Sequence, residues 1–159
     1  MPAAVLLDAL IASRERIDII TYASLFLPEQ NADAVELIRY KAQNGAKVRI
    51  ALGDPASPEI ELRDREEGTN GGIPGRIRMA MTYYSPLVGE PGIEFHLHRT
   101  TLYNTMIRFD DQMLVNQHIY GTYGYQAPVL HLRRVDTGDV FATYERSIDK
   151  VWAESYPLP

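Results

Sequence analysis

The chain has 159 residues, 45% of them apolar and 23% charged, values that are typical of a globular protein and exclude a disordered or fibrous one. Its size suits one buried core, so we expect a single domain over residues 1–159. The net charge of −5 argues against general nucleic-acid binding, which draws on a positive surface, and we expect no direct nucleic-acid contact by this domain.

The first third of the chain alternates between helical and strand patterns. Apolar residues three and four positions apart predict a helix over residues 3–14, and β-branched residues predict a strand buried on both faces over residues 16–22. Asn31 is a candidate N-cap for a helix over residues 32–44, which Gly45 separates from a second strand over residues 46–52. This order predicts a right-handed βαβ unit with parallel pairing.

The middle of the chain is richer in turn residues. We expect a highly charged surface helix over residues 59–67, a glycine-rich joint over residues 68–72, and a helix over residues 75–84 that ends before Pro86. Residues 53–55 (Gly-Asp-Pro) follow the second strand at the edge where α/β folds place ligands, although such a turn is as often only a turn.

The pattern changes to a period of two from Gly92 onward. It predicts strands over residues 93–98, 101–109, 113–119 and 129–133, followed by a helix over residues 138–154. The order of elements predicts a mixed α/β fold whose mostly parallel sheet is flanked by helices.

One predicted strand and turn carries polar residues where a buried sheet normally has aliphatic ones. Residues 103–110 (Tyr-Asn-Thr-Met-Ile-Arg-Phe-Asp) are similar to the His-x-Lys-x4-Asp strand and turn of the phospholipase D superfamily. Tyr103 stands at the place of the His, Thr105 at that of the Lys, and Asp110 matches the Asp. Residues 13–22 and 36–50 resemble the first strand and the helix-Gly-strand element of that family.

The chain most resembles the degenerate phospholipase D-like domain that follows a helix-turn-helix domain in actinobacterial transcription regulators. Residues 25–27, 50–55, 102–104, 108–111, 114–116 and 127–133 carry that resemblance. It implies one half of a phospholipase D-like fold, which acts as a ligand-sensing or dimerising effector module of a transcription regulator. A purely structural dimerisation domain is a further alternative.

The substitutions in the motif bear on catalysis. In active members of the family one His attacks phosphorus, a second protonates the leaving group, and lysines stabilise the phosphoryl oxygens. Tyr103 and Thr105 can hydrogen-bond a ligand but supply neither the nucleophile nor the positive charge. We therefore expect no catalytic residues. The alternative is a phosphodiesterase with a rebuilt active site that uses His98 or His118.

Strand alternation predicts a binding pocket for an unknown small molecule. Residues two apart in a strand share a face, so Tyr103 with Thr105, and Asn116 with His118, should converge, with His98 nearby. The four histidines of the chain match no compact ligand spacing, so we expect no metal and no other cofactor.

The remaining expectations concern partners and location. Residues 120–125 contain three tyrosines, which are enriched in interfaces, and predict the contact of a twofold homodimer. No apolar run approaches the roughly 20 residues of a membrane span, and the first eight residues lack the basic region of a signal peptide. With no cysteine in the chain, we expect a cytoplasmic protein without membrane contact.

Overall fold

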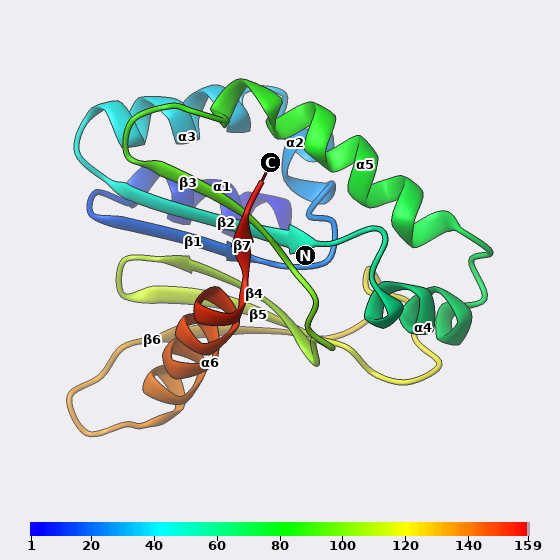
Figure 1. The fold of residues 1–159 in the computed structure, drawn as a ribbon. Helices are drawn as coiled ribbons and strands as arrows, with labels where there is room; N and C mark the ends of the chain where they lie inside the picture. The colour runs from blue at the N-terminus through cyan, green and yellow to red at the C-terminus, as the bar shows by residue number, and fades with distance from the viewer. Residues whose placement is uncertain (159) are drawn as a thin grey trace.

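The computed structural model describes residues 1–158, in which helices cover both faces of one sheet (Figure 1). In chain order the elements are α1 (Ala3–Ala12), β1 (Arg16–Ile20), α2 (Phe26–Gln30), α3 (Ala34–Gln43), β2 (Lys47–Gly53), α4 (Pro58–Glu67), α5 (Gly72–Tyr84), the 3-10 helix η1 (Ser85–Leu87), β3 (Ile93–His98), β4 (Asn104–Phe109), β5 (Gln112–Gln117), β6 (Val129–Arg133), α6 (Val140–Glu154) and β7 (Tyr156–Pro157). No helix within residues 1–158 has both the length and the apolar character that crossing a membrane requires.

The seven strands form one mixed sheet in the order β6-β5-β4-β1-β2-β3-β7. Strands β1, β2 and β3 pair in parallel, whereas the other four pairings are antiparallel. The predicted mixed α/β fold with flanking helices is confirmed. The expectation of a mostly parallel sheet is wrong. From β3 to β6 the chain is connected by loops and turns and not by the helical crossovers that parallel neighbours need, and α6 then leads to β7, which pairs antiparallel with β3.

Different helices cover the two faces of the sheet. Helices α1 and α3 pack against β4 and β2 on one face, and α6 packs against β1 and β3 on the other (Figure 1). Ile17 and Ile19 of β1 are fully buried and belong to the apolar core. Asp18 lies between them and is also fully buried, but its carboxylate accepts from Arg16 and Arg49. Strand β1 is therefore buried on both faces, as predicted, yet one face is ionic.

Most predicted elements are present with shifted ends. The helix predicted over residues 32–44 spans Ala34–Gln43, and Gly45 follows it with a φ of 99°, a left-handed conformation that favours glycine. Three elements were not predicted. Helix α2 has five residues, the 3-10 helix η1 has three and strand β7 has two, so none is long enough to show a helical or strand periodicity.

Asp110 joins the turn after β4 to the start of β1. Its Oδ1 accepts from the backbone N–H groups of Glu15 and Arg16, and its Oδ2 accepts from that of Arg14, at 2.8 to 2.9 Å. Asp110 also adopts a left-handed φ of 51°, which Asp tolerates better than most residues. The carboxylate thus holds together two segments that are more than 90 residues apart in the chain.

Candidate functional site

A chain of polar side chains crosses from Thr21, the residue that follows β1, to His118, the residue that follows β5. The Oγ1 atoms of Thr21 and Thr105 lie 3.2 Å apart, and Thr105 Oγ1 lies 3.4 Å from Nε2 of His118. On the other side of its ring, Nδ1 of His118 lies 3.0 Å from the carbonyl oxygen of Leu102, which can only accept. Nδ1 therefore carries the proton of a neutral ring, and Nε2 accepts from the Thr105 hydroxyl.

Tyr22 lies at the centre of this polar cluster. Its ring stacks on that of His118 with centroids 5.4 Å apart, and it also lies 6.0 Å from the ring of His98. The Tyr22 hydroxyl accepts from the backbone N–H of Leu102 at 2.7 Å and donates to the carbonyl of the same residue at 3.3 Å. Tyr22 is buried, so these bonds satisfy a hydroxyl that water cannot reach freely.

His98 belongs to the same cluster and is fully buried. Its Nε2 donates to the carbonyl oxygen of Thr21 at 2.9 Å, and its Nδ1 accepts from the backbone N–H of Thr100 at 3.3 Å. A ring that donates from one nitrogen and accepts at the other is neutral. Both nitrogens of His98 are therefore used within the fold.

Burial dominates the titration of these groups. Loss of water lowers the pKa of His98 and of His118 below the ordinary value of 6.5, and the Arg63 guanidinium adds to the lowering for His118. Burial likewise raises the pKa of the Tyr22 hydroxyl. At neutral pH the cluster therefore carries no charge: each histidine is a neutral ring with one N–H group, and the tyrosine keeps its hydroxyl proton.

The structure brings together some of the five residues predicted to bind a ligand. Thr105 contacts His118 and is the register partner of Asn116 in the neighbouring strand. Nδ2 of Asn116 donates to the carbonyls of Ala127 and Pro128, so this amide is bonded within the fold. Tyr103 is separate, because its side chain is 76% exposed. Strand β4 begins only at Asn104, so the alternation that was to pair Tyr103 with Thr105 does not reach it.

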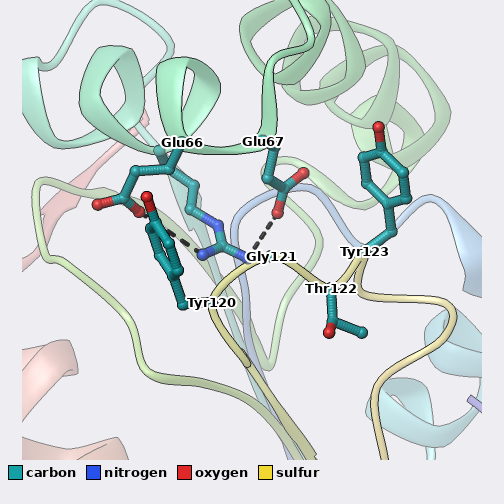
Figure 2. Close-up of a pocket in the computed structure, with 7 residues that line it drawn as sticks. Glu66, Glu67, Tyr120, Gly121, Thr122 and Tyr123 are labelled. Atoms are coloured by element: carbon teal, nitrogen blue, oxygen red, sulfur yellow. Dashed lines mark ion pairs between the residues drawn. The ribbon is translucent and has the colours of Figure 1, made fainter.

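A cavity of about 130 Å³ lies beside the polar cluster, between α4 and the loop after β5 (Figure 2). Its lining consists of Arg63, Glu66 and Glu67 from α4 and residues 120–123 from the loop. None of the five predicted residues is in that lining. We call this space the α4 cavity.

Ion pairs order the α4 side of the cavity. Nη2 of Arg63 lies 2.5 Å from Oε1 of Glu67, and its Nη1 lies 3.8 Å from Oε2 of Glu66. The Arg63 side chain is only 11% exposed although the helix is highly charged. The high charge of residues 59–67 predicted a surface helix. The charge alone could not show that the Arg63 side chain points toward the cavity and is mostly buried.

Polar residues lie at the carboxyl ends of β1 and β2. Thr21 and Tyr22 were not among the predicted site residues, whereas Asp54 belongs to the turn over residues 53–55 that the sequence singled out. Thr21 and Tyr22 follow β1 and contact both histidines of the cluster. Asp54 follows β2 and accepts from Arg99 and Tyr156 at 2.8 and 2.6 Å. The available signal was their position, since α/β folds place functional groups at this edge of a sheet.

A second hollow, of about 260 Å³, lies at the opposite end of the strands. Its lining is charged and consists of Arg16, Asp18, Lys47, Arg49, Glu94 and Asp149. Arg49 also lies over the ring of Trp152, 5.2 Å from its centroid. Within residues 1–158, no group of three or more His, Cys, Asp or Glu side chains is placed to hold a metal ion.

Comparisons with known proteins identify a shared fold. No protein-family model matches the chain, and no curated protein does. Among solved structures, the chain is similar to TrmBL2, an archaeal chromatin protein, with a TM-score of 0.60 and 10% sequence identity. The match covers 98% of this chain and 50% of that one, so the chain spans about half the length of TrmBL2.

This similarity corrects one expectation. The structure of TrmBL2 shows a novel mode of DNA binding, so a protein that contains this fold does bind DNA. The expectation that the domain makes no direct nucleic-acid contact is therefore wrong as an exclusion. It rested on the summed charge of −5, and a sum says nothing of how arginines are distributed over a surface.

Proposed function

We propose that the chain is a catalytically degenerate phospholipase D-like domain that acts as a ligand-sensing or dimerising effector module of a transcription regulator. The observation that carries the proposal is the state of the two histidines. His98 and His118 are the candidates to replace the family's nucleophile, and each has both ring nitrogens bonded within the fold. A nucleophile must instead reach the phosphorus atom of a substrate.

The surroundings of the cluster also argue against phosphodiester hydrolysis. Arg63 is the cation in the lining of the α4 cavity, and Glu67 already pairs with it. Phosphoryl oxygens that approach this cavity would meet two carboxylates. These observations favour the degenerate domain over the alternative of a phosphodiesterase with a rebuilt site.

Two features support an effector role. The α4 cavity offers a place for a small ligand beside the polar cluster, and the similarity to TrmBL2 relates the fold to a DNA-binding chromatin protein. Tyr120 and Tyr125 support the dimerising role, because both are largely exposed on the loop after β5.

A hydrolysis assay tests the proposal. The purified protein is incubated with bis-p-nitrophenyl phosphate, and separately with phosphatidylcholine and DNA, and product is measured against buffer alone. We expect no turnover from the protein or from its His98→Ala and His118→Ala variants. Turnover by the protein that disappears in either variant would establish the phosphodiesterase and reject the degenerate domain.

A further inference from the structure

The α4 cavity has a net negative lining. Arg63 supplies one positive charge, whereas Glu66 and Glu67 supply two negative charges. Arg63 and Glu67 neutralise one another across 2.5 Å. The charge that remains at the cavity is that of Glu66.

Glu66 has a carboxylate that accepts no hydrogen bond from a side chain or backbone group within residues 1–158. Its Oε2 forms a long ion pair with Nη1 of Arg63, and the 3.8 Å between these atoms exceeds a hydrogen-bond distance. The Glu66 side chain is also partly open to solvent. It can therefore accept from a ligand without breaking a bond of the fold.

Aromatic rings from the loop lie next to these carboxylates. Figure 2 shows Tyr120 on the same side of the cavity as Glu66, and Tyr123 across from them. Tyr123 stacks on Tyr125 with centroids 5.8 Å apart and planes 7° apart, which fixes that wall. Tyr120 is 83% exposed and lies at the rim, where its ring is available to a ligand.

We propose that the α4 cavity binds a small organic cation, an alkylammonium group held by the carboxylate of Glu66 and the ring face of Tyr120. A carboxylate pairs with the charge and accepts from its N–H groups, while an aromatic face attracts a cation through its quadrupole. The inference rests on the ligand-sensing role proposed above and names the chemical class of the ligand.

The size and the charge of the cavity select this class. A cavity of about 150 Å³ is known to hold a six-carbon ring, so the 130 Å³ here suits a ligand head of about six heavy atoms. An anion would approach two carboxylates, and the one guanidinium in the lining, that of Arg63, already pairs with Glu67. A neutral ligand would leave the charge of Glu66 unmatched.

The probe pair for the test is n-butylammonium and n-butanol, which have the same chain and differ in the charged group. Each is titrated into the isotopically labelled protein at constant ionic strength, and amide chemical shifts are followed by NMR. For n-butylammonium we expect saturable shifts at residues 63–67 and 120–123, with half-saturation on the order of 1 to 10 mM. For n-butanol we expect no saturable shift there.

Two variants and a matched control assign the binding to named groups. Glu66→Gln should raise the half-saturation concentration by about fivefold or more, and Tyr120→Ala by about threefold. Glu61→Gln removes the same charge from α4, at an exposed side chain that is not in the cavity lining, and should leave binding unchanged. Equal shifts with n-butanol, or unchanged binding in Glu66→Gln, would overturn the inference.

The hydrolysis assay separates this inference from the proposed function. If n-butylammonium fails to bind while bis-p-nitrophenyl phosphate stays intact, the organic-cation site is rejected and the degenerate domain stands. If the phosphodiester is cleaved while n-butylammonium still binds, the degenerate domain is rejected and the cation site stands.

Discussion

Nε of Arg49 donates to Oδ1 of Asp18 across 2.6 Å and so joins two neighbouring parallel strands through a carboxylate that has no exposed surface. Arg16 donates to the other oxygen of the same carboxylate at 2.8 Å. Both arginines continue to Asp149 of α6, at 3.1 and 2.9 Å. Asp18 is therefore the negative centre of an ionic layer between the sheet and α6.

Removal of that centre should be costly. In an Asp18→Ala variant Arg16 and Arg49 would remain beneath α6 without their buried partner, and breaking a buried pair costs about 3 to 5 kcal/mol. We expect the free energy of unfolding, measured by urea denaturation, to fall by about that amount. Asp149→Asn is the control, since Asp149 is half exposed, and it should cost less than about 1 kcal/mol. Equal losses of unfolding free energy in the Asp18→Ala and Asp149→Asn variants would contradict the central role of Asp18 in this ionic layer.

The turn at Asp110 makes a second prediction about stability. An Asp110→Ala variant loses the acceptor for three backbone N–H groups and places alanine at a φ of 51°. Hydrogen bonds to a charged group and the left-handed conformation each contribute, so we expect a loss of about 3 kcal/mol. Asp111→Ala, one residue away, removes only an exposed pair with Arg134 and should cost about 0.5 kcal/mol. Urea denaturation of both variants measures the difference.

The buried histidines predict how stability depends on pH. Burial lowers the pKa of His98 in the folded chain, so as the pH falls the unfolded chain takes up a proton first. The stabilisation is therefore fully present above the unfolded value of about 6.5 and is lost as the pH falls through the folded pKa. His96 and His118, whose pKa values are also lowered by burial, act in the same direction.

Unfolding measured between about pH 7.5 and pH 5.5 checks this dependence. The free energy of unfolding should fall by up to about 1.4 kcal/mol per pH unit for each such histidine. A His98→Gln variant should show a shallower slope, whatever its absolute stability. A slope that is independent of His98 would mean that this ring is not held neutral by burial.

The proposed dimer predicts a mass and a sensitive residue. Light scattering should give twice the 18.0 kDa of the chain at concentrations well above micromolar. Tyr125 is 77% exposed, and Tyr125→Ser should shift the equilibrium toward the monomer. Tyr40→Ser changes a tyrosine of α3 that is 59% exposed and should have no effect. A mass of 18.0 kDa for the unmodified protein at those concentrations would reject the dimer.

Periodicity predicted most of the fold but could not predict pairing partners. The β-branched run before Thr21 predicts a strand, and the helix that ends at Gly45 predicts a parallel neighbour for it. The other neighbour of β1 is β4, which pairs with it so that Asp18 lies opposite Arg108 and Ile17 opposite Phe109 in the strand register. Those contacts join distant segments, and a local pattern carries no information about them.

The same limit applies to the candidate site. Alternation correctly brought Thr105 toward His118, because strand geometry holds over those residues. It did not hold at Tyr103, which precedes β4 and whose side chain is exposed. The sequence could not predict that the ion pair of Arg63 with Glu67 lines a cavity. Oppositely charged residues four positions apart give the same sequence pattern whether they lie on an exposed or on an inward face of a helix.

The central place of β1 has a consequence for biosynthesis. Ile17 of β1 pairs with Val48 of β2, which is made soon afterwards, and with Phe109 of β4, which is made much later. A growing chain that ends before residue 104 therefore has its central strand unpaired along one edge, and such an edge recruits other strands. The nascent protein stays vulnerable to misassembly on the ribosome until the hairpin of β4 and β5 has emerged and closed over β1.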